Sequence, residues 1–223
     1  MARSSSPEPD ERRPSPAGSL DDVEADALFA LVETSIRGGL TARRDRRGAA
    51  LPRLDFEGLP DVLRRHQGVF VTLKVAGQLN GCIGTLEARE PLGSAAVRAA
   101  YEAAFADPRL PPLSPGHWPE LSIGLSLLSG LEPVPAGSAP ELLAALRPGT
   151  DGLLLGAGWR RATFLPAMWE QLPEPAEFLH HLLAKGGLPE RPWPVDLRGW
   201  RYTAVELVRR ATPLPPAFVA PQG

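Results

Sequence analysis

Gln78-Leu79-Asn80-Gly81-Cys82-Ile83-Gly84-Thr85 contains the only cysteine of the chain, with a glycine close to it on either side. Glycine inside a strand costs stability and usually marks a β-bulge or the close approach of another backbone or a ligand. A thiol on a short apolar strand between two glycines is therefore the first candidate for a functional site. The other segments are interpreted below by how they position this strand.

The residues immediately before this stretch indicate its pairing partner. Apolar side chains occupy every odd position from Val69 to Val75, which is the pattern of a half-buried strand. Ala76-Gly77-Gln78 follows as a turn signal. The two segments together predict a β-hairpin.

A loop with an odd number of residues gives this hairpin the register that keeps its apolar side chains together. A slip of one residue would move every side chain to the other face. In the odd register Leu79 joins the valine face, and Cys82 lies opposite Thr72. Asn80 then lies opposite Lys74. This register places Lys74 diagonal to Cys82, at roughly 7–8 Å between strand positions, where a positive charge assists a thiol nucleophile.

The composition is that of an ordinary soluble protein. The chain has 223 residues, of which 43% are hydrophobic, and a formal charge of −2, so nothing electrostatic favours nucleic acid or an anionic membrane as a partner. A single cysteine excludes an internal disulfide and fits a reducing compartment. Four histidines without metal-ligand spacing argue against a structural zinc site, and the sequence leaves the identity of any cofactor unknown. Without an apolar run of about 20 residues or a secretory core, we expect a cytoplasmic protein.

The remaining segments predict the fold class and the boundaries of the domain. Residues 1–18 are rich in Ser, Pro and charge and are expected to be a disordered tail. Residues 211–223 form a Pro-rich tail, which leaves one domain over 19–210. Apolar and alanine spacing predicts helices over 20–37, 60–66, 91–106, 140–146 and 173–185, and strands over 121–131, 151–156, 160–165 and 200–208.

These elements mix helices and hairpins without a regular βαβ repeat. The predicted class is therefore α+β, with mainly antiparallel sheets flanked by helices. Gly38-Gly39 is expected to end the first helix. The four tryptophans from Trp159 to Trp200 are expected to lie in the core or to line a groove.

Two charged residues follow the second main helix in a Pro-flanked turn. Asp107 and Arg109 can pair with each other, cap the helix, or hold an anionic ligand. Cys82 itself has two interpretations, a functional thiol or a small buried hydrophobic residue. His117, in a loop rich in Pro and Gly, is a candidate base for the thiol.

An arginine cluster at Arg43, Arg44, Arg46 and Arg47 raises the possibility of RNA binding. No aromatic residues interleave these arginines, which favours a solvated loop over a nucleic-acid surface.

Several motifs taken together resemble the AMMECR-one domain family, whose prokaryotic members include the AmmeMemoRadiSam system protein A. The resemblance extends from about residue 20 to residue 210. It rests on Leu79–Thr85, Ala104–Arg109, Pro119–Leu128, Asp151–Leu153, Thr163–Pro166, Trp169–Pro173, Phe178–Leu179 and Lys185–Leu188.

The resemblance implies a larger subdomain built from both chain ends and a smaller inserted one. It also implies an association with a Memo-like protein and a radical SAM protein. One position departs from the family pattern, because the family usually has Arg where this chain has Asn80.

Two functional hypotheses follow. In the first, the protein is a small enzyme, for example in nucleotide or RNA modification. Cys82 is then catalytic, and the ligand-binding residues are Asn80, Gly81, Gly84, Thr85, Lys74, Asp107 and Arg109. In the second, the protein is a non-catalytic adaptor, in which the glycines let the backbone of a partner or small ligand approach closely.

Overall fold

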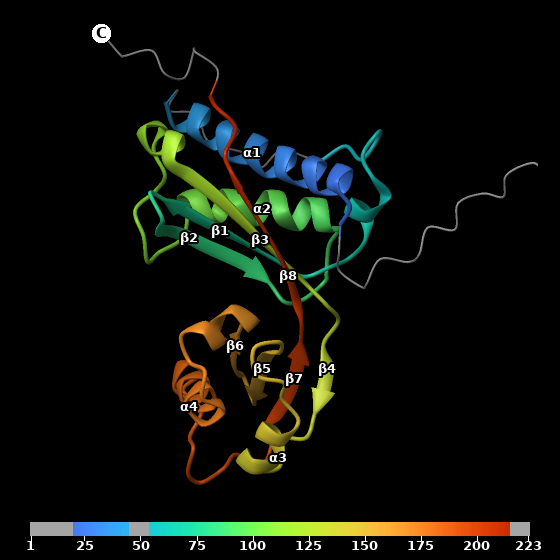
Figure 1. The fold of residues 1–223 in the computed structure, drawn as a ribbon, viewed down its shortest axis with the longest axis vertical. Helices are drawn as coiled ribbons and strands as arrows, with labels where there is room; N and C mark the ends of the chain where they lie inside the picture. The colour runs from blue at the N-terminus through green and yellow to red at the C-terminus, as the bar shows by residue number, and fades with distance from the viewer. Residues whose placement is uncertain (1–19, 45–53, 215–223) are drawn as a thin grey trace, which may run out of the picture.

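The structure is a computed structural model that describes residues 20–44 and 54–214. Two subdomains lie one above the other in Figure 1, and each contains a four-stranded antiparallel sheet, with strand orders β2-β1-β3-β8 and β4-β7-β5-β6. The larger subdomain contains both ends of the described chain, and the smaller one is inserted between β3 and β8. The predicted α+β class and its inserted subdomain are confirmed.

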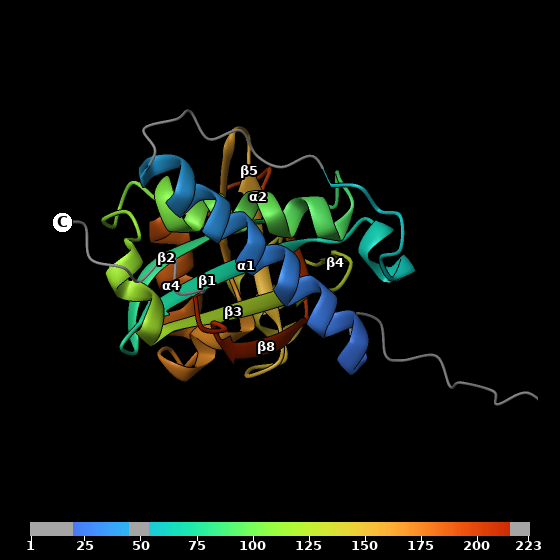
Figure 2. The ribbon, with the colours of Figure 1, turned by 90° about the horizontal axis from the view of Figure 1, so that it is seen from above.

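Two long helices cover one face of the larger sheet, as Figure 2 shows from above. The helices are α1 (Asp22–Arg44) and α2 (Leu92–Phe105), with short 3-10 turns at η1 (Asp61–Arg64) and η2 (Pro115–Glu120). The strands are β1 (Val69–Val75), β2 (Gln78–Thr85), β3 (Leu121–Leu128) and β8 (Ala204–Arg210). The opposite face of this sheet is turned toward the smaller subdomain.

The core of the larger subdomain forms where the helices meet the sheet. Val69, Val71 and Leu73 of β1 are completely buried together with a stripe of alanines on α2. Burial of each such Val or Leu stabilises the fold by about 1.5–3 kcal/mol. Because alanine side chains are small, α2 lies close to the sheet, and at Gly81 of β2 no space is left for a Cβ atom.

The prediction that Gly38-Gly39 ends the first helix is wrong, because α1 continues to Arg44. A Cβ atom on Gly39 would lie 2.1 Å from the Phe105 ring, so this glycine makes room for the aromatic ring of α2. A Cβ on Gly38 would meet no atom within 4 Å. The two adjacent glycines predicted a helix end, whereas Gly39 serves the packing of α1 against α2.

The predicted strand over 200–208 is two strands in different sheets. β7 (Arg198–Tyr202) belongs to the smaller subdomain and β8 to the larger one. β4 (Glu132–Val134), which contains Pro133, lies just beyond the strand predicted over 121–131 and forms a separate strand of the smaller sheet. Pro133 is tolerated because β4 is an edge strand, where a missing N–H breaks no ladder.

The smaller subdomain packs its sheet against α3 (Ala139–Ala144), α4 (Pro175–Lys185) and the 3-10 turn η3 (Pro166–Glu170). Its hairpin consists of β5 (Gly152–Ala157) and β6 (Arg160–Phe164), close to the predicted bounds. Trp169 stacks on Phe178 with ring centroids 3.8 Å apart and lies in the core as expected. Trp159 does not, because it is 88% exposed at the tip of the hairpin.

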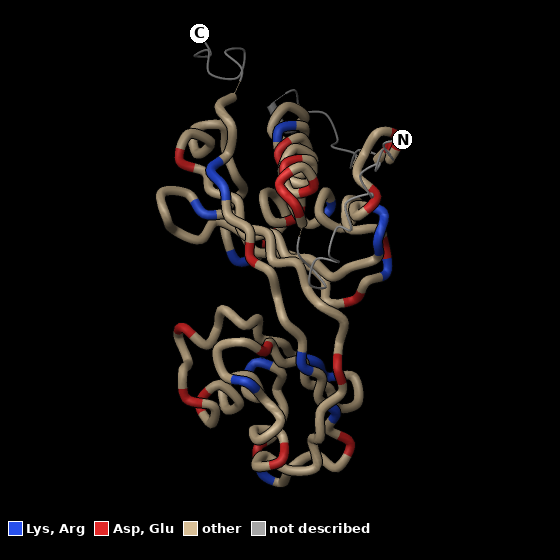
Figure 3. Tube along the Cα trace, turned by 45° about the vertical axis from the view of Figure 1, so that its right-hand side comes forward, with Lys and Arg blue, Asp and Glu red and all other residues tan. Residues whose placement is uncertain are grey.

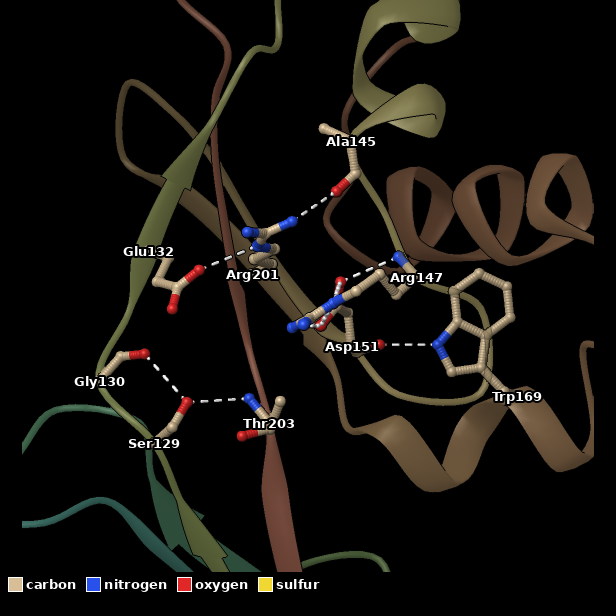
Figure 4. Close-up of polar contacts among 9 residues, drawn as sticks. All are labelled: Ser129, Gly130, Glu132, Ala145, Arg147, Asp151, Trp169, Arg201 and Thr203. Carbon is tan, nitrogen blue, oxygen red and sulfur yellow. Dashed lines mark hydrogen bonds and ion pairs between the residues drawn. The ribbon is translucent and has the colours of Figure 1, made fainter. Parts of the chain in front are cut away.

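A buried carboxylate organises the entry to β5 (Figure 4). The side chain of Asp151 is fully buried and accepts hydrogen bonds from the backbone and the guanidinium of Arg147, at 2.6–3.1 Å. The backbone carbonyl of Asp151 accepts the indole N–H of Trp169 at 2.6 Å. These contacts give Asp151, part of a motif in the family resemblance, a structural role.

The chain passes between the subdomains twice, and the two passages are hydrogen-bonded to each other. The N–H of Ser129 donates to the carbonyl of Thr203 at 2.9 Å. The N–H of Thr203 donates to Oγ of Ser129, also at 2.9 Å (Figure 4). Around this junction Leu128, Leu154 and Tyr202 form a small buried cluster. Burial raises the pKa of Tyr202 far above its ordinary value.

Much of each predicted tail lies outside the described residues. Residues 211–214 are described, and Thr212 is fixed there. Its N–H donates to Glu33 at 2.9 Å, and its carbonyl accepts the indole N–H of Trp118 at 2.7 Å.

Candidate functional site

The hairpin that carries Cys82 has the predicted pairing at the thiol but not at the turn. Cys82 lies opposite Thr72, as expected. The loop, however, has two residues, Ala76 and Gly77, both with positive φ, and a β-bulge follows it. Lys74 therefore lies opposite Leu79 rather than Asn80, and Leu79 is 47% exposed instead of joining the valine face. The bulge restores at Cys82 the register that the two-residue turn would have shifted.

Cys82 lies on the sheet face that is turned toward the smaller subdomain. Its Sγ accepts a hydrogen bond from the Thr72 hydroxyl at 3.4 Å, and the residue is partly exposed. The next pair on this face, Phe70 and Gly84, lines a cavity of about 320 Å³, to which the smaller subdomain contributes Arg161. We call it the Arg161 cavity.

On the other side, Thr72 lines a second cavity between the subdomains, of about 200 Å³. Lys74, Ser126 and Glu206 also line it, and we call it the Glu206 cavity. Burial raises the pKa of Glu206, although its hydrogen bond from Ser126, at 2.8 Å, acts in the opposite direction. Cys82 thus lies between two cavities rather than at the floor of either.

Asp107 and Arg109 hold the backbone of Cys82 at the open edge of the sheet. β2 is an edge strand, and the outward N–H of Cys82 donates to Asp107 Oδ2 at 3.0 Å. The outward carbonyl of Cys82 accepts Arg109 Nη2 at 2.9 Å. An unpaired edge is open to pairing with another chain, and this charged turn occupies it. We call the arrangement the edge clamp.

The carboxylate of the edge clamp is strongly stabilised in its charged form. Asp107, with a side chain 2% exposed, accepts Arg109 Nε at 2.9 Å and Nη2 at 2.7 Å. The hydrogen bonds from Arg109, joined by that from the Cys82 backbone, hold the pKa of Asp107 far below its usual range. The Arg109 side chain is 60% exposed, so one face of the guanidinium remains open to solvent.

The two glycines beside Cys82 are required by the chain's own packing. A Cβ on Gly81 would lie 1.9 Å from the carbonyl oxygen of Ala103 in α2. A Cβ on Gly84 would lie 2.3 Å from the carbonyl oxygen of Val69 and 2.5 Å from the Phe70 ring. The close approach that these glycines predicted is therefore made by helix α2 and strand β1.

The other candidates named in the sequence analysis make contacts of their own. Asn80 is buried in the bulge, where its Nδ2 donates to the Pro111 carbonyl at 3.1 Å, and its Oδ1 has no partner among the described residues. Thr85 lines the Arg161 cavity and hydrogen-bonds to the backbone of Glu87. His117 accepts a hydrogen bond from the Ser114 backbone in η2, which gives it a capping role.

Lys185, at the end of α4, is a site residue that the sequence analysis did not select. Its ammonium donates to the Thr163 carbonyl at 2.9 Å and lies 5.1 Å from the centroid of the Phe164 ring. Because Thr163 lines the Arg161 cavity, Lys185 places a cation beside the space between the two subdomains, which we call the cleft. Arg109 Nη2 lies 2.9 Å from the Cys82 carbonyl. Lys185 ends the helix predicted over 173–185, whereas its contact with Thr163 of β6 depends on the tertiary structure.

The AMMECR1 family model matches residues 31–207. The chain belongs to the AMMECR1 family. This is the family that the motifs around Cys82 and Asp107 resemble, and the matched range includes every residue of the cleft described above.

Related AMMECR1 proteins come from several microorganisms, among them Thermotoga maritima. A protein of Methanothermobacter thermautotrophicus is 40% identical over 134 residues, which cover 60% of this chain and 70% of the relative. A protein of Methanosarcina barkeri is 33% identical over 78% of this chain and 84% of its own length. The crystal structure of the uncharacterized protein PH0010 from Pyrococcus horikoshii has a similar fold, with a TM-score of 0.68 at 27% identity. The match covers 85% of this chain and 98% of that protein.

The described part of this AMMECR1 protein has no helix with the length and apolar character needed to cross a membrane. Figure 3 shows Lys and Arg interspersed with Asp and Glu over both subdomains. Arg46 and Arg47 of the arginine cluster lie outside the described residues.

Proposed function

We propose that this AMMECR1 domain is a small enzyme in which Cys82 acts as a nucleophile in the cleft between the subdomains. One observation carries the proposal: cations from both subdomains are held at the cleft. Arg109 Nη2 donates to the Cys82 carbonyl at 2.9 Å, and the Lys185 ammonium donates to the carbonyl of Thr163, a residue that lines the Arg161 cavity. A substrate in the Arg161 cavity would lie between the two subdomains. We also propose the cytoplasm as its location and Memo-like and radical SAM proteins as its partners, on the family resemblance.

The roles within the cleft follow from the contacts. The edge clamp fixes the Cys82 backbone, and the Thr72 hydroxyl orients its sulfur. Arg109 and Lys185 supply charge that attracts an anionic substrate to the sulfur. Nucleotides belong to that class of substrate, which keeps nucleotide or RNA modification as the proposed area of activity.

The thiol can be tested with two alkylating reagents that differ mainly in charge. Because Cys82 is the only cysteine, the intact mass reports its alkylation directly. We expect the rate ratio of iodoacetate to iodoacetamide to exceed that of N-acetylcysteine by roughly tenfold at low salt, and to fall as salt screens the cations. Lys185→Gln should lower this ratio. Arg160→Gln should not, because that guanidinium donates to the Gly187 carbonyl instead.

An unreactive Cys82 in the folded protein, together with a reactive one in urea, would overturn the thiol role. A rate ratio equal to that of N-acetylcysteine, or one unaffected by Lys185→Gln, would remove the electrostatic basis of the proposal.

The alternative function, a protein-binding adaptor, is favoured by one surface. Trp159 and Val195 are fully or almost fully exposed, and their neighbours Gly158 and Asp196 are hydrogen-bonded at 2.9 Å. Exposed Trp beside Arg is typical of binding hot spots. In a pull-down with a Memo-like protein, an adaptor would tolerate Cys82→Ser and lose binding with Trp159→Ser. Binding that survives Trp159→Ser would count against this surface.

A further inference from the structure

We propose that Lys185 is a second nucleophile of the cleft, an amine that forms an imine with small aldehydes or ketones carrying an anionic group. This activity goes beyond the proposed thiol chemistry, because it requires no sulfur. The proposal rests on where the amine lies, on its charged neighbours, and on how few lysines the chain contains.

The amine lies next to a residue that lines the Arg161 cavity. The last turn of α4 brings Lys185 Nζ to the Thr163 carbonyl, and Thr163 lines the Arg161 cavity. The Phe164 ring covers one side of the ammonium at 5.1 Å. Although Lys185 is exposed as a whole residue, its charged end is packed between a strand and an aromatic ring.

The surroundings of Lys185 make its ammonium easier to deprotonate than that of a free lysine, so that neutral amine is available for attack while most of the side chain stays charged. Among the described residues, no carboxylate forms an ion pair with it. Burial lowers the pKa of Lys185, and the positive charge of Arg109 lowers it further, while Cys82 acts in the opposite direction. A lysine that is desolvated, or placed beside another cation, becomes a nucleophile near neutral pH. Because Asp107 holds Arg109 with two hydrogen bonds, the neighbouring cation is fixed in place.

Lysine is rare in this chain. Of its 24 basic side chains only Lys74 and Lys185 are lysines, and both line or border the cavities of the cleft. Arginine stays protonated and cannot attack a carbonyl carbon, whereas a lysine amine can. The chemistry of a primary amine is therefore confined to these two side chains and the α-amino group. Lys74 serves as an internal control.

The same neighbours indicate the class of substrate. The exposed face of Arg109 suits a carboxylate or phosphate, and the Arg161 cavity, at about 320 Å³, accommodates a small metabolite. The amine lone pair attacks the carbonyl carbon, and the oxygen gains a proton to give a carbinolamine. Loss of water then gives the imine, so the step needs no oxidant or reductant.

Glyoxylate, which combines an aldehyde with a carboxylate, is a suitable probe when followed by borohydride. Hydride adds to the imine carbon and leaves a stable secondary amine, which peptide mass spectrometry locates. At pH 7.5 we expect Lys185 to be labelled roughly tenfold faster than Lys74 in the folded protein, and equally fast in urea. Lys185→Arg should remove this label, and Lys74→Arg should leave it.

Two further variants separate this proposal from the thiol proposal and test the class of substrate. Cys82→Ser should retain the label, which makes the outcome independent of the thiol proposal. Arg109→Gln should slow labelling by glyoxylate more than labelling by neutral acetaldehyde, with folding checked by circular dichroism. Equal labelling of the two lysines in the folded protein would overturn the proposal. Equal slowing of both aldehydes by Arg109→Gln would overturn the assignment of an anionic substrate.

Discussion

Gly81→Ala is expected to destabilise the protein by more than about 3 kcal/mol, because helix α2 leaves no space for a methyl group. The new Cβ would lie 1.9 Å from the Ala103 carbonyl oxygen and 2.8 Å from its carbonyl carbon. Both are backbone atoms, so relief requires a shift of α2 or β2 rather than a new rotamer. Thermal unfolding should show a loss of roughly 6–12 °C in Tm for a chain of this size.

A glycine in the same sheet provides the control. A Cβ on Gly124 of β3 would be 3.6 Å from its nearest neighbour, a carbon of Thr72, which is ordinary contact. Gly124→Ala should therefore change stability by less than about 1 kcal/mol. Similar unfolding curves for the two variants would show that α2 does not press on Gly81. Replacement of Gly81 consequently reports on packing and cannot by itself test ligand binding.

Asp107→Asn is expected to cost about 2–4 kcal/mol at pH 7, because it removes the charged partner of Arg109 and weakens the bond to the Cys82 N–H. The folded-state pKa of Asp107 lies below its unfolded value, so its charge contributes stability above that unfolded value of about 3.9. The contribution is lost as the pH falls further. Urea titrations should show a constant difference from pH 8 to pH 5 and a shrinking one below about pH 4.

A variant of an exposed aspartate serves as the control, because it shows how far the loss of stability at low pH is specific to Asp107. Asp26 pairs with Arg209 on the surface, with side chains 66% and 41% exposed. Asp26→Asn should cost less than about 1 kcal/mol. A deficit in Asp107→Asn that does not change between pH 7 and pH 3 would contradict the assigned role of the charged carboxylate.

Local patterns in the sequence predicted the fold class and the environment of the thiol. Alternation from Val69 to Val75 identified the strand, and the hydrophobic pattern placed Cys82 opposite Thr72, where the structure has it. These succeed because strand pairing between neighbours depends on nearby residues. The predicted pairing of Lys74 with Asn80 was wrong, because a β-bulge at Asn80 shifts the register there. The apolar pattern does not indicate this bulge, which is accompanied by a hydrogen bond from Asn80 to the Pro111 carbonyl.

Other features depend on contacts between segments far apart in the chain. Gly39 could be recognised as a packing residue only once Phe105 was placed against it. Lys185 and Arg109 belong to different subdomains, so no spacing along the chain predicts that Lys185 lies at the Thr163 carbonyl while Arg109 binds the Cys82 carbonyl. The last predicted strand divides at Thr203 because the chain changes sheets there, although its apolar pattern continues.

The adjacent passages at Ser129 and Thr203 have an evolutionary consequence. Leu128 pairs with Ala204 at the end of the β3–β8 ladder. Strands β3 and β8 are thus paired like the two arms of a β-hairpin, and the smaller subdomain takes the place of the hairpin loop. Insertion between neighbouring ends is tolerated because it leaves the host's pairing intact. Residues 129–203 could thus have been acquired, lost or exchanged as one cassette. Such an exchange would bring a new partner for Cys82 while preserving the strand and the edge clamp that hold it.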